Sequence, residues 1–201
     1  HHRVCSLYLR NETGGHRRGA LTDHVSGLAV RVDDEYAGVL SDGLDMSHDA
    51  WLTWAKAVVP AGDTQFEAII PDYAATLLGL LESRDSGKTW TRIAGIPDRV
   101  TAVTAAGPQL IRAGDWRGAV WLYDPVSKVA EKTDTFSGGI TSVYGPLVAT
   151  TNGVYPDRPG PLHGREVSRV VISSNSLWAA RAKGGIYLAD DSLNWRLAYK
   201  G

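Results

Sequence analysis

Short apolar stretches alternate with turn-forming residues along most of the chain. They recur in pairs, such as SGLAVRV with YAGVLS and VSRVVI with SLWAARA, and Gly, Asp, Asn or Pro bounds them. β-Branched and apolar residues that alternate with small ones between such breakers are typical of β-strands joined by tight turns. The best helical rival, residues 45–59, coincides with one copy of the repeat described next. The pattern therefore predicts an all-β protein.

The strand pairs belong to a repeat in which a small residue and a short apolar stretch lead to an Asp. The five Asp residues are 33 to 39 positions apart and are Asp49, Asp85, Asp124, Asp157 and Asp190. A unit of this length holds about four short strands, which form one antiparallel sheet that cannot cover both of its own faces. Several sheets must therefore stack. The architecture that suits them is a β-propeller of about five four-stranded antiparallel blades.

The repeat also predicts how the chain is organised. Residues 1–24 are expected to form an N-terminal strand, RVCSLYL, and a polar loop, RNETGGHRRG. This strand either closes the ring by completing a terminal blade or is an extra strand, and six blades is the alternative count. Residues 25–201 are assigned to the propeller, with blades at about 25–59, 64–95, 99–133, 139–166 and 167–200.

The fourth blade departs from the repeat at its end. Its last segment, YPDRPGPLHGRE, contains Pro156, Pro159 and Pro161, which cannot donate hydrogen bonds to a strand ladder. We therefore expect an extended loop in place of a fourth strand. This loop is either a contact with a partner or with another copy of the chain, or a tolerated surface insertion.

The octet SRDSGKTW holds the best-defined turn of the repeat. Ser83 and Asp85 can fold their side-chain oxygens back onto backbone N–H groups, and Gly87 supplies positive φ at no steric cost. Trp90 opens the next strand and can bury its ring between neighbouring blades. Partial copies of the octet contain Ser47, Asp49, Trp54, Asp190 and Trp195.

This octet resembles the Asp-box, or BNR repeat, of the sialidase-like β-propellers. In that family the box lies at the turn between the third and fourth strands of a blade, away from the catalytic centre. The resemblance implies a propeller fold and a structural role for the octet residues. It selects no function, because sialidases, sortilin-type receptors, assembly factors, xyloglucanases and phage tail proteins share the box.

The sequence displays no complete catalytic constellation. A sialidase would need an arginine triad that clamps a carboxylate, and the Phe/Tyr-Arg-Ile-Pro motif of that family is missing from TRIAGIPDR. A general glycosidase needs two carboxylates across a cleft. The candidate carboxylates are Glu67, Asp98, Asp115 and Glu166. We favour a non-enzymatic protein with no catalytic residue, and a carbohydrate-active enzyme, a glycoside hydrolase, is the alternative.

Binding is expected on loops at the end of the blades opposite the Asp-box turns, because rigid scaffolds commonly carry function on variable loops. The segment RAGDWRG is the most chemically dense of these loops, and its candidate residues are Arg112, Asp115, Trp116 and Arg117. Aromatic and Arg groupings are favoured at binding hot spots and sugar-stacking sites. The alternative is that Trp116 packs between blades. Asp98 and Arg99, in a connection between blades, form a second candidate.

Composition narrows the possible partners. A formal net charge of −1 gives no general drive towards nucleic acid or anionic membrane. The single cysteine, Cys5, excludes an intramolecular disulfide and a cysteine-based zinc site, and the longest apolar stretch, YAATLLGLL, is too short to span a bilayer. The chain also lacks a phosphate-binding loop and a His-Glu-x-x-His motif. We expect no metal or cofactor, no nucleic-acid partner and no membrane insertion.

The predicted function is a binding or scaffold module that recognises a protein or a glycan. Arg outnumbers Lys and Ala is abundant, which is typical of a GC-rich genome such as that of an actinobacterium or one of its phages. A structural or receptor-binding component of a phage particle is therefore one expected setting, and the chain would be virion-associated or secreted. A homo-oligomer or larger assembly, and a fragment of a larger propeller, are further alternatives.

Overall fold

The computed structural model describes residues 5–11, 14–21, 25–31, 34–39, 43–49, 53–107, 109–156, 160–173, 176–181, 184–190 and 192–200. It describes side chains from residue 43 onward, apart from Ile172 and Ser173. Every regular element in these ranges is a β-strand, and no helix long and apolar enough to cross a membrane occurs in them. The chain forms two compact units, His1–Val100 and Thr101–Gly201.

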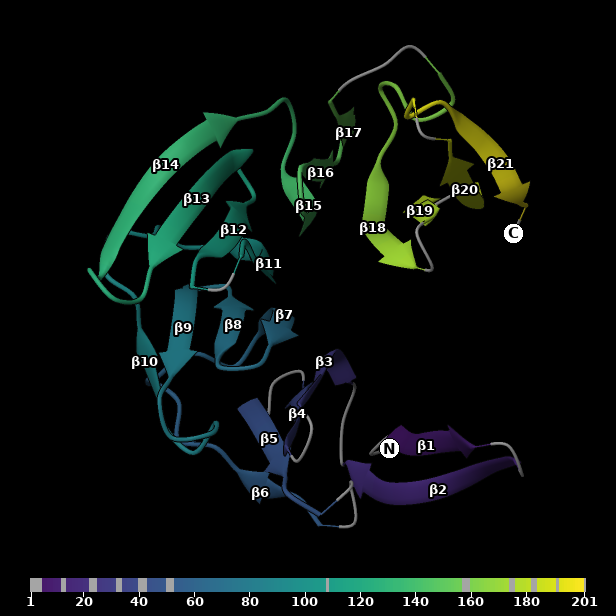
Figure 1. Ribbon diagram of the computed structural model, residues 1–201. Coiled ribbons are helices and arrows are strands. Elements are labelled where there is room, and N and C mark those ends of the chain that lie inside the picture. The colour runs from purple at the N-terminus through teal and green to yellow at the C-terminus, as the bar shows by residue number, and fades with distance from the viewer. Residues whose placement is uncertain are drawn as a thin grey trace. The chain divides into compact units, whose positions relative to one another are not determined.

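The first unit contains a hairpin and two four-stranded antiparallel sheets (Figure 1). The hairpin pairs β1 (Cys5–Asn11) with β2 (Gly14–Leu21). The first sheet contains β3 (Val25–Arg31), β4 (Asp34–Val39), β5 (Gly43–Ser47) and β6 (Ala55–Lys56). The second sheet contains β7 (Phe66–Ile70), β8 (Tyr73–Thr76), β9 (Gly79–Ser83) and β10 (Trp90–Arg92).

The hairpin differs from the polar loop expected at residues 10–19. Most of that segment lies in β2, which pairs along its length with β1 from Cys5 opposite Leu21 to Asn11 opposite Gly14. A two-stranded ladder is held by backbone hydrogen bonds, which any stretch without proline can supply. Because the expectation of a loop rested on polarity alone, the side-chain pattern gave no signal for this strand.

The second unit contains two four-stranded sheets and one three-stranded sheet. The first sheet contains β11 (Val100–Ala105), β12 (Ile111–Asp115), β13 (Ala119–Asp124) and β14 (Val129–Thr135). The three-stranded sheet contains β15 (Ile140–Tyr144), β16 (Leu147–Thr150) and β17 (Gly153–Tyr155). The last sheet contains β18 (Val167–Ser173), β19 (Ser176–Arg181), β20 (Ile186–Ala189) and β21 (Trp195–Tyr199).

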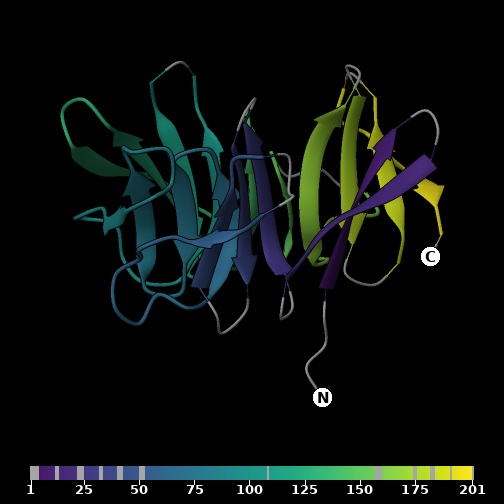
Figure 2. The same ribbon diagram turned by 90° about the horizontal axis from the view of Figure 1, so that it is seen from below.

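These sheets confirm the prediction of an all-β protein built from about five small antiparallel sheets. The three-stranded sheet is the one whose end carries the prolines, and β17 stops directly before Pro156. The repeat position Asp157 lies outside the described residues. In every sheet the strands follow one another in chain order, so successive turns alternate between the two ends of the sheet (Figure 2).

Each unit has its own apolar core between neighbouring sheets. In the first unit Leu44 and Met46 of β5 pack with side chains of the second sheet, among them Phe66, Leu81 and Trp90. In the second unit two clusters fill the spaces on either side of the three-stranded sheet. The residues that build them include Ala102, Val120, Ile140, Val143 and Val148 in one cluster and Leu147, Val154, Val170, Ala179 and Tyr187 in the other.

The turn between β9 and β10 is fastened by Asp85. Its Oδ1 accepts the backbone N–H of Thr89 at 2.8 Å, and its Oδ2 accepts the Thr89 hydroxyl at 2.6 Å. Ser83 Oγ donates to Asp85 Oδ1 at 3.0 Å and accepts the Gly87 N–H at 2.8 Å. The buried indole of Trp90 donates to the Gly87 carbonyl at 2.7 Å. The side chains of the octet therefore satisfy one another and the backbone of the same turn.

This turn also joins the two sheets of the first unit. The Val58 N–H donates to the Lys88 carbonyl at 2.8 Å, and the Trp90 N–H donates to the Val58 carbonyl at 2.9 Å. The neighbouring Ala57 N–H donates to the carbonyl of Leu44 in β5 at 2.9 Å. Residues 57 and 58, which leave the first sheet, are thus hydrogen-bonded to both sheets. These bonds require the turn between β9 and β10 to keep its shape.

The turns that begin at Asp49, Asp85 and Asp190, here called the Asp turns, share one hydrogen-bond pattern. Asp49 Oδ1 accepts the Thr53 N–H at 2.9 Å, and Asp190 Oδ1 accepts the Asn194 N–H at 2.9 Å. In both turns Oδ2 accepts the side chain of that same residue. Asp124 differs, because it bonds the Val126 N–H and the Ser127 hydroxyl within a shorter turn.

Replacement of Trp90 tests how strongly the first unit depends on this turn. Trp90→Ala removes a buried indole and should lower the free energy of unfolding by about 3–5 kcal/mol. Trp90→Phe keeps a ring but loses the N–H donor, and should cost at least about 1 kcal/mol. Lys88→Ala, an exposed neighbour, should stay within about 0.5 kcal/mol. Urea unfolding measures the stability of all three variants. If Trp90→Ala were as stable as Lys88→Ala, the first unit would not depend on this turn.

The Asp85 carboxylate predicts a dependence of stability on pH. Hydrogen bonds from Thr89 hold the pKa of Asp85 below its ordinary value. A carboxyl with a lowered folded-state pKa stabilises the fold above its unfolded pKa, and this contribution disappears as the pH falls through the folded pKa. The stability difference between the native chain and Asp85→Asn should therefore narrow as the pH falls from about 5 to about 2. Thermal unfolding across this range is the measurement, and a constant difference would contradict it.

Candidate functional site

The turn between β12 and β13 is shaped by the buried carboxylate of Asp115. Its Oδ1 accepts the backbone N–H groups of Arg117 at 2.8 Å and Ala119 at 3.0 Å. Its Oδ2 accepts the indole N–H of Trp121 at 3.0 Å. Because both oxygens are engaged and the side chain is buried, Asp115 acts on any ligand only through the turn that it holds.

Trp116 and Arg117 are the side chains that this turn presents to solvent. Trp116 is 42% exposed, and the guanidinium carbon of Arg117 lies 5.2 Å from the centre of its ring. A guanidinium at this distance from an aromatic face makes a cation–π contact, which limits the motion of both side chains. The turn therefore offers a flat apolar surface with a positive charge beside it.

Glycines allow the connection between β14 and β15 to lie directly against this turn. A Cβ on Gly139 would come within 2.6 Å of the Trp116 carbonyl oxygen, and one on Gly118 within 2.2 Å of the Phe136 carbonyl oxygen. The Phe136 N–H donates to the Gly118 carbonyl at 2.8 Å. Real Cβ contacts are not this short, so only glycine permits the approach.

The same connection is bonded to the turn between β16 and β17. The Thr151 N–H donates to the Gly139 carbonyl at 2.9 Å, and the Gly139 N–H donates to Thr151 Oγ1 at 3.1 Å. Asn152 Nδ2 donates to Ser137 Oγ at 3.0 Å. Three loops at one end of the sheets thus lie against one another, and the exposed residues on them, Trp116, Arg117, Ser137 and Asn152, are here called the Trp116 surface.

The structure places Arg112 away from this surface. Arg112 lies three residues before Asp115 on β12, which is about 10 Å along a strand. Its Nη1 donates to the carbonyl of Gly145, in the turn between β15 and β16, at 2.5 Å. Burial lowers the pKa of the Arg112 guanidinium, and the Asp134 carboxylate opposes this shift. Arg112 therefore joins two neighbouring sheets near the opposite end of its strand.

Asp98 and Arg99 lie in the first unit, in the connection that follows β10. The Arg99 N–H donates to the Leu77 carbonyl at 2.8 Å, and Arg99 has a φ of +56°. The structure thus separates the six candidate residues into three places: the connection after β10, the start of β12, and the turn held by Asp115.

Sequence reasoning missed Ser137 and Asn152. Both belong to short polar connections next to glycine, in SGG and TNG, and such pairs usually indicate only a turn. Their proximity to Trp116 depends on contacts between loops of two different sheets, which one segment cannot reveal. Within the described part of the chain, no three His, Cys, Asp or Glu side chains lie close enough together to hold a metal ion.

No family model and no curated protein matches the sequence. Among solved structures, the extracellular domain of BT4673 from B. thetaiotaomicron has a TM-score of 0.69 at 18% identity, over 91% of this chain and 31% of that one. An ancestral GH74 enzyme has a TM-score of 0.68 at 16% identity, over 87% and 31%. YCF48 from Cyanidioschyzon merolae has a TM-score of 0.65 at 14% identity, over 94% and 77%.

These neighbours are propeller-type proteins, and at such low identity the likeness concerns the fold alone. Together with the all-β architecture and its small antiparallel sheets, it confirms the β-propeller fold class. The chain spans about a third of the length of the BT4673 domain and of the GH74 enzyme. Activities of those whole proteins therefore do not carry over to it.

A single methyl group tests how closely the loops of the Trp116 surface are packed. Gly139→Ala would place a Cβ against the backbone of Trp116, and we expect it to destabilise the protein by about 1–3 kcal/mol. Gly160→Ala, where a Cβ would meet no atom within 4 Å, is the matched control and should be neutral. Urea unfolding and the exposure of Trp116 to acrylamide quenching measure the effect. Equal behaviour of the two variants would disprove the close packing.

Proposed function

We propose that this chain is a non-enzymatic binding module whose ligand contacts the Trp116 surface. The observation that carries the proposal is a large exposed aromatic ring, paired with Arg117, on a turn fixed by a buried carboxylate. Trp and Arg are over-represented among residues that dominate binding energy, and a rigid turn reduces the entropy lost on binding.

A glycan is the ligand that this surface suits best. The exposed indole can stack on the apolar face of a sugar ring, and its neighbours Arg117, Ser137 and Asn152 carry donors and acceptors for hydroxyl groups. A protein partner that inserts an apolar side chain beside Trp116 is the second candidate, and it is favoured by the same cation–π pair. Asp98 and Arg99 remain a separate proposed site in the first unit.

The Asp turns support the assignment of ligand binding to the end of the sheets that carries the Trp116 surface, because the Asp turns lie at the opposite end. We propose that they are Asp-boxes, since their carboxylates are engaged in structural hydrogen bonds. Each joins the third and fourth strands of its sheet, whereas the Trp116 turn joins the second and third. A phage particle, with the module as a structural or receptor-binding component, is a proposed setting that rests on composition and on the Asp-box resemblance.

Glycan-array binding of the native chain and of matched variants tests this proposal. Trp116→Ala and Arg117→Ala should each weaken binding about tenfold or more, because stacking or a charged contact is lost. Val126→Ala changes an exposed apolar residue at the opposite end of the same sheet and should bind like the native chain. Analysis of the glycans after incubation with the native chain tests the enzymatic alternative. Cleavage of a glycan would show that the chain is not a pure binding module. Glycan binding that survives Trp116→Ala would move the site elsewhere.

A further inference from the structure

The last sheet of the chain, β18 to β21, has two different faces. Val170, Ala179 and Tyr187 alternate onto the face that packs in the core of the second unit. The opposite face is formed by the residues between them, and Val171 and Ile186 on it are each 40% exposed. This second face, here called the Trp178 face, comprises Arg169, Val171, Trp178, Ala180, Ile186, Leu188, Arg196 and Tyr199.

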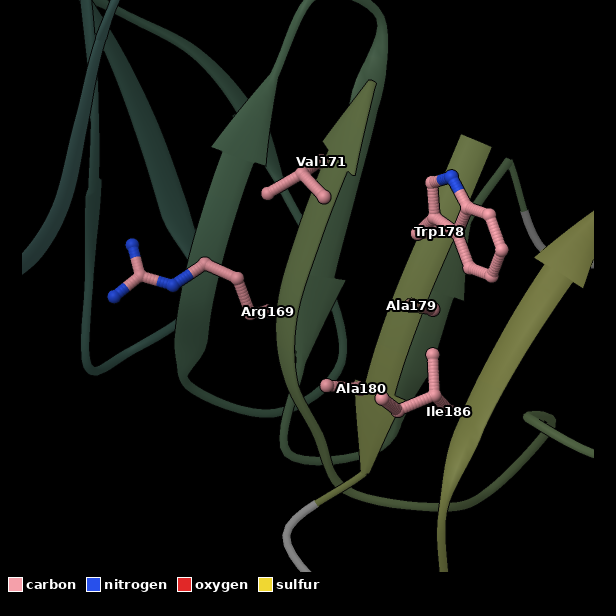
Figure 3. Close-up of a pocket in the computed structure, with 6 residues that line it drawn as sticks. All are labelled: Arg169, Val171, Trp178, Ala179, Ala180 and Ile186. Carbon is pink, nitrogen blue, oxygen red and sulfur yellow. The ribbon is translucent and has the colours of Figure 1, made fainter. Parts of the chain in front are cut away.

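A hollow of about 420 Å³ lies on this face over β18, β19 and β20 (Figure 3). The strand register explains it. Ala180 stands in one row with Arg169 and Ile186, next to the row of Val171 and Trp178. One methyl side chain surrounded by larger ones leaves a depression with Ala180 at its floor. The lining is almost entirely apolar, which suits a bulky apolar group.

Arginines lie on both edge strands of this face, and one of them, Arg169, lines the hollow. Arg169 lies on the edge strand β18 and Arg196 on the edge strand β21, opposite Leu188. Figure 3 shows the Arg169 side chain extending away from Trp178. Neither arginine forms an ion pair with a described residue. The four strands contain three arginines and no acidic residue.

This arrangement argues against a symmetric pairing of two copies through the Trp178 face. Two such faces in contact would bring the arginines of one copy towards those of the other, and opposed like charges in an interface are unfavourable. An acidic partner would instead be attracted to the arginines at both edges while its apolar group fills the hollow. An apolar centre with Arg nearby is typical of protein interfaces.

We propose that the Trp178 face binds an acidic protein segment that inserts one bulky apolar side chain over Ala180 and offers carboxylates to Arg169 and Arg196. The two edge strands are about 14 Å apart at ordinary strand spacing. In an extended segment, residues four apart are separated by about 14 Å and point to the same side. The expected motif is therefore an acidic residue, an apolar residue two positions later, and an acidic residue two positions after that.

Fluorescence polarisation with a labelled peptide, Ser-Glu-Ser-Phe-Ser-Glu-Ser, tests the proposal on the full chain. We expect it to bind at least about tenfold more tightly than Ser-Lys-Ser-Phe-Ser-Lys-Ser or Ser-Glu-Ser-Ser-Ser-Glu-Ser. Ala180→Leu should fill the hollow and abolish binding. Arg169→Gln and Arg196→Gln should each weaken it several-fold and reduce its dependence on salt. Arg165→Gln, an exposed arginine outside the face, and Trp116→Ala are the controls that should bind normally.

Unfolding curves check that Ala180→Leu remains folded. If this variant unfolds, Arg169→Gln and Arg196→Gln still test the proposal. The proposal is overturned if the native chain binds no peptide, if the lysine peptide binds equally well, or if the arginine variants bind like the native chain. Sedimentation that reveals a dimer disrupted by Val171→Glu would assign the face to a second copy instead. Trp178 shielded from iodide quenching would assign it to another part of this chain.

Discussion

The structure depends on carboxylates that accept the backbone N–H of a residue four positions ahead. Asp85 does so at Thr89, and this bond holds the strand β10 so that Trp90 enters the core and the backbone beside it pairs with Val58. Asp115 uses the same geometry towards Ala119, although its turn joins a different pair of strands. A short strand has few ladder hydrogen bonds, so its ends must be fixed by such turns if neighbouring sheets are to stack.

The two ends of the sheets carry different chemistry for this reason. At the end of the sheets that carries the Asp turns, polar side chains form hydrogen bonds within the turns themselves. The side chains of Thr89 and Asn194 do so with the Asp carboxylates. At the other end of the second unit, Asp115 satisfies its turn from inside, and Trp116 remains exposed. A buried anchor with an exposed aromatic tip is rigid and still able to bind, which is the combination that a recognition surface needs.

The strand period explains why one sheet can contribute to a core and also present a second surface. In β19, Ala179 is buried in the apolar cluster, and its neighbours Trp178 and Ala180 line the hollow on the opposite face. Alternation gives each strand two independent sets of side chains. The core selects the first set by packing, which leaves the second free to differ in charge and shape.

The sequence by itself determined the strand-and-turn repeat, the all-β class and the octet turn around Asp85, because these follow from local alternation and from side chains that bond within eight residues. It could not reveal β2, which backbone pairing alone defines, or the separation of Arg112 on β12 from Trp116 in the turn that follows this strand. Only the tertiary structure brought Ser137 and Asn152 towards Trp116 and placed Arg169 and Arg196 at opposite edges of one face. Such neighbours come from different strands and loops, and their proximity is set by register and by glycine contacts rather than by any local pattern.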